Sequence, residues 1–504
     1  MEKLLLAHDL GTSGNKATLF GENGDLIASV NHEYPTHYAP GNIAEQSPDD
    51  WWEAVRITTN KLLEGREAGR VAGIAFSGQM MGCLCVDKQG RPLRDHMLYC
   101  DQRAVEQAAA FAGRAGADEV YQITGHRPSA SYSAAKLMWV RDNQPDVYKK
   151  THRMLNAKDY LNFRLTGRMV TEPVDASGTN LYDLEGGVWS EKLTAAAGLD
   201  PAMLPEIIPS TGIVGELTHE AAASLGLKAG VPVAAGAGDG VAAGVGAGSV
   251  APGLTYNYLG SSSWIAATSE KPLYDPQRRT FNWAHAVPGL FHPCGTMQTA
   301  AASYAWLRRE ICHEEATRAE AFGKSPYEFM DETAAGSPPG SNSLLYLPYL
   351  MGERTPRWNP LTRGGFVGLT INHTRADMVR SVLEGVAMNL SFIVDIFRSH
   401  GVGVDKLTVI GGGARSGLWR TIMADVYETE VRRPNFLEEA TAIGAAIIAG
   451  VGSGVYRDFS VVDRFFRIVD AVPCNSGNLD VYRRNKVLFD KIYQALEPLF
   501  PDFR

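Results

Sequence analysis

The stretch KLLLAHDLGTSGNKATLF, residues 3–20, decides the fold class of this chain. An apolar run ends at Asp9, a Gly-Thr-Ser-Gly turn follows at residues 11–14, and a second apolar run begins near Lys16. Turn residues between two apolar runs predict two strands joined as a hairpin. We therefore expect strands at residues 3–9, 16–20 and 26–31.

The second half of the chain opens with a similar pattern. Strands expected at residues 255–259 and 264–267 flank the turn Gly260-Ser261-Ser262, and both turns read Leu-Gly-[Thr/Ser]-Ser. A four-residue match is not rare by chance, but here both copies lie inside a strand hairpin. We expect an α/β fold of two duplicated lobes, residues 1–250 and 251–504, with a cleft between them.

Helix signals fill in the rest of both lobes. Ser47-Pro48 followed by two acidic residues predicts the start of a helix. Thr374, with Asp377 three residues later, predicts a capping box for a helix over residues 376–398. We expect a mostly helical middle over residues 105–230, a helix from about Ser416, and further strands at 72–76, 84–86, near 213, 231–235 and 407–410.

The composition is that of an ordinary globular protein. Hydrophobic residues make up 45% and charged residues 21%, which excludes disorder or a coiled coil as the main architecture. The net charge of −8 argues against nucleic-acid or anionic-membrane partners, because phosphate contacts need a basic surface. A nucleotide ligand stays open, since backbone N–H groups can bind its phosphates.

Targeting and redox signals are weak. The most apolar stretch, residues 440–452, is shorter than the roughly 20 residues of a membrane helix. The first residues lack the apolar region of about 7–15 residues that a secretory signal needs. The six cysteines form no Cys-x-x-Cys pair, which favours reduced thiols. We therefore expect a cytoplasmic protein with no membrane partner.

Asp9 directly precedes the first glycine-rich turn. The N–H groups and hydroxyls of such a turn can bind phosphate oxygens. Asp9 would repel a phosphate unless Mg²⁺ lies between them. The alternative is a plain hairpin in which Asp9 accepts hydrogen bonds from the turn. The second turn has Tyr258 in the place of the acid, so a phosphate clamp built from both turns would have its metal carboxylate on one side only.

Asp239 is the only charged residue between Lys228 and Glu270. It lies where an apolar strand runs into a segment of small residues, so its carboxylate will be poorly solvated and its proton affinity raised. Such a group suits a general base that takes a proton from an alcohol. The alternative is an aspartate that caps the following helix.

Three other glycine patterns bear on nucleotide binding. Gly238-x-Gly240-x-x-Ala243 fits a dinucleotide fingerprint, but no acid follows it before Glu270 to bind the ribose. Gly323-Lys324-Ser325 lacks the first glycine of a phosphate-loop motif, because Arg318 stands there. Gly411-Gly412-Gly413 joins a strand to a helix, where a nucleoside could lie against bare backbone.

Two longer stretches carry a family resemblance. Ser-x-Ser-x-x-Lys-Leu-x-Trp-Val-x-Asp-Asn covers residues 131–143, and a second pattern, from Gly-x-Phe-x-Gly-Leu to Ser-Val-Leu-Glu, covers residues 364–384. Both are similar to signatures of the FGGY family of carbohydrate kinases, whose superfamily also holds hexokinase, actin and the Hsp70 ATPase. The resemblance extends over nearly the whole chain and implies two ribonuclease H-like lobes with ATP, Mg²⁺ and a sugar between them.

The resemblance also implies a role for each motif residue. Asp239 would be the catalytic base, and Asp9 would organise Mg²⁺, through water. Met80, Met81 and Asp101 would contact the sugar together with Asp239. The phosphates and the adenosine of ATP would be held by Gly11, Thr12, Ser13, Lys16, Gly260, Ser261, Ser262, Gly412, Gly413 and Ala414.

Within the family, the chain resembles the xylulokinase-like branch. Residues 77–82 and 352–356 are similar to its sugar loop and to a loop of its second lobe. The branch usually has histidine where Met81 stands, and asparagine or glutamine where Gly240 follows the catalytic aspartate. Both departures remove a hydrogen-bonding side chain from the sugar site, which changes how hydroxyl patterns are discriminated.

The resemblance implies phosphorylation of a ketopentose such as D-xylulose to its 5-phosphate. Erythritol, L-xylulose and gluconate stay open as substrates. Non-kinase ATPases of the actin and Hsp70 type carry an aspartate where Tyr258 stands and lack both long signatures, and an idle sugar sensor would not need Asp9 and Asp239. We also expect a homodimer.

Overall fold

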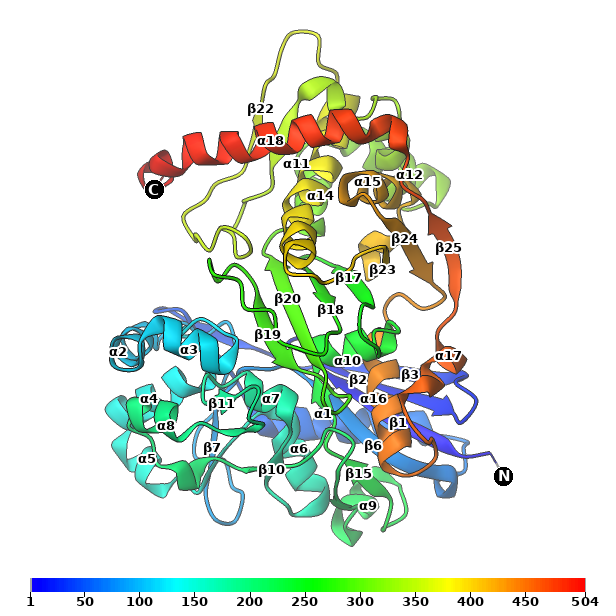
Figure 1. The fold of residues 1–504 in the computed structure, drawn as a ribbon. Coiled ribbons are helices and arrows are strands. Elements are labelled where there is room, and N and C mark those ends of the chain that lie inside the picture. Colours follow the sequence, from blue (N-terminus) through cyan, green and yellow to red (C-terminus); the bar gives the residue numbers. More distant parts are fainter. Residues whose placement is uncertain (1, 504) are drawn as a thin grey trace.

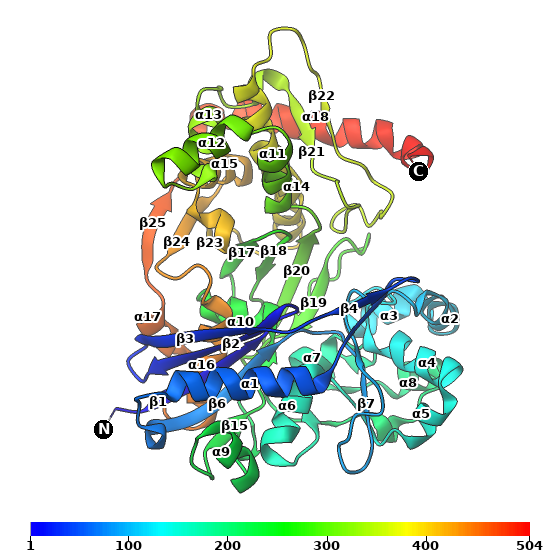
Figure 2. The same cartoon turned by 180° about the vertical axis from the view of Figure 1, so that it is seen from behind.

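The computed structural model describes residues 2–503, so the outer bounds of the two predicted lobes, residues 1 and 504, lie outside the described residues. The chain forms two stacked lobes, with the N-terminal half in the lower one and most of the C-terminal half in the upper one (Figures 1 and 2). Each lobe is built on a seven-stranded sheet. No helix between residues 2 and 503 has both the length and the apolarity needed to cross a bilayer.

The first sheet grows from the predicted hairpin. β2 is antiparallel to both β1 and β3, β6 is parallel to β1, and β15 is parallel to β6. The order is β14-β15-β6-β1-β2-β3, with β16 paired to β6. Its strands are β1 (Leu4–Leu10), β2 (Gly14–Gly21), β3 (Leu26–Glu33), β6 (Val71–Gly78), β14 (Ile213–Glu216), β15 (Pro232–Ala234) and β16 (Ala237–Gly238).

The second sheet repeats this arrangement. β18 is antiparallel to both β17 and β20, β23 is parallel to β17, and β24 is parallel to β23. The order is β19-β20-β18-β17-β23-β24-β25. Its strands are β17 (Thr255–Leu259), β18 (Ser263–Ala267), β19 (Phe281–Ala284), β20 (Phe291–Met297), β23 (Lys406–Ile410), β24 (Glu430–Pro434) and β25 (Ile468–Val472). The predicted duplication is therefore confirmed.

Helices cover both sheets. α1 (Pro48–Leu63) packs on β2 and β3, and the hydroxyl of its N-cap Ser47 accepts from the Asp49 N–H at 3.3 Å, as predicted. α14 (Arg375–Ser399) begins with the predicted capping box of Thr374 and Asp377. The upper lobe also contains α11 (Ala301–Glu310), α12 (His313–Phe322), α13 (Pro326–Ala335), α15 (Gly417–Tyr427) and α18 (Leu479–Leu496).

The predicted helical middle forms a bundle beside the first sheet (Figure 1). Short strands such as β7 (Leu84–Val86) and β9 (Arg153–Leu155) tie it to that sheet's lobe. The helices are α2 (Val105–Ala115), α3 (Ala117–Thr124), α4 (Ser133–Asn143), α5 (Pro145–Lys150), α6 (Ala157–Thr166), α7 (Pro173–Ser177), α8 (Glu191–Ala197) and α9 (His219–Leu225).

Two helices cross between the lobes with almost no side chain between them. α16 (Ala440–Gly452) comes from the second half of the chain yet packs on β1 and β6 of the lower lobe, and it crosses α10 (Asp239–Gly246) (Figure 1). A Cβ at Gly444 would lie 1.9 Å from the Ala242 carbonyl oxygen, and one at Gly246 would lie 1.8 Å from the Ala440 carbonyl oxygen. Only glycine at these two positions allows the backbones to approach so closely.

Candidate active site

Two cavities lie where the turns of the two lobes meet. The larger one, about 790 Å³, is lined by Asp9, Gly260 and Ser261, while a smaller one of about 230 Å³ is lined by Thr12, Asp239 and Ser262. Successive residues of the same turns therefore line both cavities. A phosphate group held between the turns would face both cavities.

Asp239 begins α10 directly after β16, and β16 pairs with the end of β6. Its Oδ1 accepts from the Gly240 N–H at 2.7 Å. Burial raises the pKa of the Asp239 carboxyl to about 7, and the negative charge of Asp9 adds to the shift. The sequence argument from poor solvation predicts the same direction. A carboxylate that titrates near neutral pH is suited to general-base catalysis.

Asp9 lies at the carboxyl end of β1. Its Oδ1 accepts from the Ser77 hydroxyl at 2.8 Å, and burial raises the pKa of the Asp9 carboxyl. Lys16, its partner across the hairpin, lines neither cavity. The Lys16 ammonium instead donates to the Glu438 carbonyl at 3.1 Å and lies 3.7 Å from the Glu439 carboxylate. Lys16 thus links the two lobes beside the larger cavity.

The glycine-rich turn after β23 forms one wall of the larger cavity. Gly411, Gly412 and Gly413 line it, whereas the Ala414 side chain is buried away from it. Gly411 has φ +87°, and a Cβ there would lie 2.8 Å from the Leu259 carbonyl oxygen. The glycine therefore lets the turn of one strand lie directly against the turn of its neighbour.

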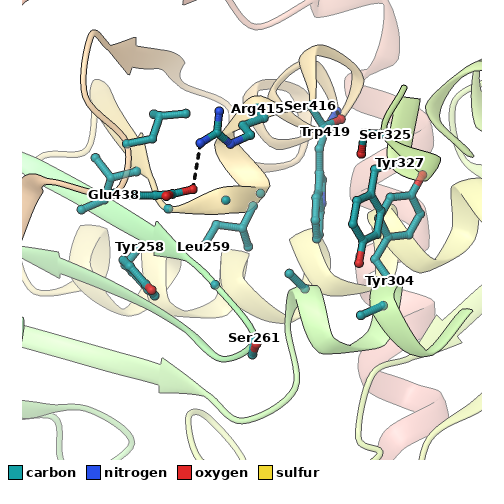
Figure 3. Close-up of a pocket in the computed structure, with 18 of the residues that line it drawn as sticks. Tyr258, Leu259, Ser261, Tyr304, Ser325, Tyr327, Arg415, Ser416, Trp419 and Glu438 are labelled. Atoms are coloured by element: carbon teal, nitrogen blue, oxygen red, sulfur yellow. Dashed lines mark hydrogen bonds and ion pairs between the residues drawn. The ribbon is translucent and has the colours of Figure 1, made fainter. Parts of the chain in front are cut away.

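An aromatic wall closes the far end of the larger cavity (Figure 3). The rings of Tyr304 and Tyr327 are stacked with centroids 5.6 Å apart, and Trp419 lies 5.7 Å from Tyr304. An ion pair of 2.8 Å between Arg415 and Glu438 lies on the opposite side. Sequence reasoning missed the three aromatic residues, because α11, α13 and α15 supply them and no short motif connects them.

The smaller cavity contains the predicted sugar loop. Met80 and Met81 line it together with Asp239 and Gly240. Sequence reasoning missed the aromatic side chains that complete its wall, because they lie on strands of the other lobe. They are Trp264, Phe281 and Trp283.

Arg354 also lines the smaller cavity. It belongs to the loop that the sequence singled out at residues 352–356. No carboxylate between residues 2 and 503 forms an ion pair with its guanidinium, and the neighbouring Glu353 carboxylate accepts from the Gln298 N–H and the Asn389 amide instead. Burial raises the pKa of Glu353 to about 8, so this carboxyl neutralises Arg354 poorly.

Asp101 lies outside both cavities, as do Gly11, Ser13, Lys16 and Ala414 among the predicted site residues. Its buried carboxylate accepts from the Ala44 N–H at 2.9 Å and forms an ion pair of 2.6 Å with Arg103. Because these two partners occupy the carboxylate, Asp101 makes no direct contact with the sugar cavity in this conformation. The predicted contact between Asp101 and the sugar therefore stays a prediction.

Comparisons with known proteins agree with this geometry. The N-terminal and C-terminal domains of the FGGY family of carbohydrate kinases match residues 4–246 and 255–453. A xylulose kinase of Bacillus subtilis is 31% identical over 99% of this chain and 98% of its own. A gluconokinase of the same organism is 31% identical over 99% of this chain and 95% of its own.

Solved structures show the same relationship. The ligand-bound xylulose kinase from Lactobacillus acidophilus superposes with a TM-score of 0.93 at 25% identity, with both chains covered in full. A xylulose kinase from Rhodospirillum rubrum gives 0.91 at 28% identity over 99% of this chain and all of its own. The chain belongs to the FGGY family of carbohydrate kinases and is an enzyme that phosphorylates a sugar with ATP.

Proposed function

We propose that this kinase phosphorylates the terminal hydroxyl of an open-chain sugar, with D-xylulose as the first candidate and its 5-phosphate as the product. The observation that carries the proposal is Asp239, a carboxylate with a pKa of about 7 in the small cavity, beside the turns that would grip a triphosphate. Several relatives that match over nearly the full length are xylulose kinases, which supports the choice of sugar.

Asp239 acts as the general base. It accepts the proton of the sugar hydroxyl as that oxygen attacks the γ-phosphorus in line. The apolar walls from Trp264, Phe281 and Trp283 exclude water, which would otherwise accept the phosphoryl group. Because Asp239 must be ionised, kcat/KM should fall as the pH drops below about 7.

Asp9 fits a role beside a metal ion. It offers one carboxylate, and residues 2–503 contain no group of three or more His, Cys, Asp or Glu side chains that could hold an ion by themselves. Phosphate oxygens and water would have to complete the coordination, as is usual for Mg²⁺. Bound Mg²⁺ neutralises negative charge on the phosphates. Asp9, ionised and hydrogen-bonded to Ser77, would hold it in place, through water.

The two turns and the glycine-rich turn would divide ATP among them. The phosphates would be held through the N–H groups and hydroxyls of Thr12, Ser13, Ser261 and Ser262. Gly11 and Gly260, whose N–H groups donate to the Gly14 and Ser262 carbonyls, would let the phosphates approach the backbone closely. Lys16 would join them by leaving Glu439 for a phosphate oxygen. Gly412, Gly413 and the backbone at Ala414 would support the adenosine, with its base toward Tyr304 and Tyr327.

A sugar acid such as gluconate is the second candidate substrate. Arg354 lines the small cavity, and no carboxylate of residues 2–503 forms an ion pair with its guanidinium. Arg–carboxylate pairs are strong and directional. The relatives that carry the name gluconokinase agree with this alternative. Met80 and Met81 would then contact the apolar face of the chain of either sugar.

We further propose that the protein is a cytoplasmic homodimer. We also propose that each chain is divided into its two lobes near residue 250. The six cysteines form no disulfide among the described residues, which suits a reducing compartment. The two sheets draw their strands from before and after this boundary. Light scattering on the purified protein, against a monomer mass of 54.6 kDa, tests the dimer.

An ADP-release screen tests the substrate. The panel is D-xylulose, L-xylulose, erythritol, gluconate and glycerol, with Asp239→Asn as the blank. D-xylulose should give the highest kcat/KM of the panel. If Arg354 selects a carboxylate instead, gluconate should give the highest kcat/KM. ADP release that occurs without any sugar would overturn the proposal. So would sugar-dependent ADP release that is as fast in Asp239→Asn as in the wild type.

A further inference from the structure

The turn of the sugar loop has a strained backbone. Met81 has φ +64°, the left-handed region that side chains other than glycine rarely adopt. The same residue lines the cavity that contains Asp239. The next residue, Gly82, packs so closely that a Cβ would lie 1.9 Å from the ring of His96. Something must therefore stabilise Met81 in this conformation, since the loop cannot relax toward His96.

Lys136 of α4 contacts this turn through its ammonium group. Its ammonium donates to the carbonyl oxygen of Met81 at 2.8 Å and also to the carbonyl oxygen of Ser131. The Lys136 side chain is fully buried. It thereby connects two loops, one that carries Met81 and one that precedes α4.

The charge of Lys136 has no structural counterpart. No carboxylate of residues 2–503 forms an ion pair with it, and the nearby Asp101 is occupied by Arg103. Burial lowers the pKa of the Lys136 ammonium to about 7. A buried cation that is held only by carbonyl oxygens costs stability, because desolvation is not offset by an opposite charge. The fold therefore gains little from this lysine apart from the two hydrogen bonds.

We infer that Lys136 is a positioning residue for the sugar: its ammonium holds the Met81 carbonyl and so fixes the strained turn in the conformation that shapes the substrate cavity. The inference rests on the proposed function of that cavity. It also gives a physical task to the lysine of the first long sequence signature. Lys136 does not line the small cavity, so it does not contact the sugar itself.

A double-mutant cycle between positions 136 and 81 tests the inference. With D-xylulose as the probe, Lys136→Met should raise the KM for the sugar about tenfold, the effect of one lost charge-assisted hydrogen bond, while the KM for ATP changes less than about twofold. Lys136→Gln keeps an N–H donor and should recover part of the loss. In a Met81→Gly background the turn has no strain to hold, so Lys136→Met should change the KM less than about threefold.

Hydrogen exchange gives a readout that needs no substrate. In Lys136→Met, amides of residues 79–83 should exchange faster, while those of residues 411–416 in the nucleotide cavity should not. Equal effects of Lys136→Met in both backgrounds, a parallel rise in the KM for ATP, or unchanged exchange at residues 79–83 would overturn the inference.

Folding and substrate failures remain distinguishable in this design. If Lys136→Met shows no cooperative melting, the KM and exchange measurements are made on Lys136→Gln instead. If neither variant melts cooperatively, Lys136 is a folding element and the inference is wrong. A wild-type protein that phosphorylates no sugar of the panel would refute the proposed function alone, and the exchange measurement would still decide the role of Lys136.

Discussion

The two glycine-rich turns occupy equivalent places in the two lobes. The residue two positions before each turn, however, has polar neighbours in the first lobe and apolar neighbours in the second. Asp9 lies beside Lys16 across its hairpin and beside Ser77 on the parallel strand, and both neighbours are polar. Tyr258, in the equivalent place, lies beside Trp264 and Ile410. The Tyr258 and Trp264 rings are stacked, with centroids 4.1 Å apart.

This difference shows how a duplicated fold forms an asymmetric active site. Both turns keep the backbone N–H groups and hydroxyls that suit phosphate. The N-terminal lobe supplies Asp9 at this position, and the C-terminal lobe supplies the stacked rings of Tyr258 and Trp264. The pKa of Asp239 responds to the charge of Asp9, so a second acid in the place of Tyr258 would make the base harder to ionise.

The largest expected effect comes from removing the base. Asp239→Asn should lower kcat for the sugar about 10³-fold, since general-base catalysis typically contributes about 10²–10⁴-fold. ATP affinity by calorimetry should stay nearly unchanged, because the proposed nucleotide site is the other cavity. An Asn variant with more than about a tenth of the wild-type kcat would remove Asp239 from the mechanism.

Removing the acid of the first turn should have the next largest effect. Asp9→Asn should lower kcat about 10²-fold, the loss expected for one electrostatic contact to the transition state, and should raise the Mg²⁺ concentration needed for half-maximal rate. Its residual activity should persist to lower pH, because Asp9 no longer raises the pKa of Asp239.

Ser77→Ala is the matched control for that variant. It removes only the hydroxyl that donates to Asp9, so its loss should be about tenfold or less. If Asp9→Asn needs no more Mg²⁺ than the wild type does, Asp9 has no part in metal binding.

The crossing of α10 and α16 tests whether the two lobes are also equivalent in packing. Gly444→Ala should lower the free energy of unfolding by about 1–3 kcal/mol, because the new methyl group would overlap the Ala242 carbonyl. Gly246→Ala should cost a similar amount, since its methyl group would meet the equivalent carbonyl of Ala440. Urea denaturation of both variants measures the two losses.

Gly113→Ala is the control for the two crossing variants. Gly113 lies in α2, and a Cβ there meets no atom within 4 Å. This substitution should be neutral or should stabilise the protein by up to about 1 kcal/mol, because alanine favours the helix. A large loss in only one of the two crossing variants would show that the two lobes do not share the contact equally.

Local patterns predicted much of this molecule because local chemistry decides those parts. The two hairpins, the caps at Ser47 and Thr374, and the isolation of Asp239 each depend on residues that are neighbours in the sequence. The aromatic wall of Tyr304, Tyr327 and Trp419 could not be predicted, because it forms only when three helices pack together. Asp101 illustrates the same limit, since Arg103 and Ala44 determine where its carboxylate points.

The smallest expected effect comes from making the second turn resemble the first. Tyr258→Asp would place a new carboxylate near Asp9 and Asp239, both of which lie close enough to Tyr258 to raise the pKa of its hydroxyl. The pKa of Asp239 should then rise above about 7. Since the base works when ionised, the variant should be about three- to tenfold slower than Tyr258→Asn at pH 7, with one pKa unit worth about tenfold.

Tyr258→Asn is the matched control for this last variant, because it removes the same ring without adding charge. The gap between the two should close by about pH 9, where Asp239 is ionised in both, as full profiles of kcat/KM against pH would show. A gap that stays constant with pH would mean that the new acid acts by repelling the phosphates and not through the base. The aromatic residue at the second turn would then matter for ATP binding, and the asymmetry of the two turns would have another cause.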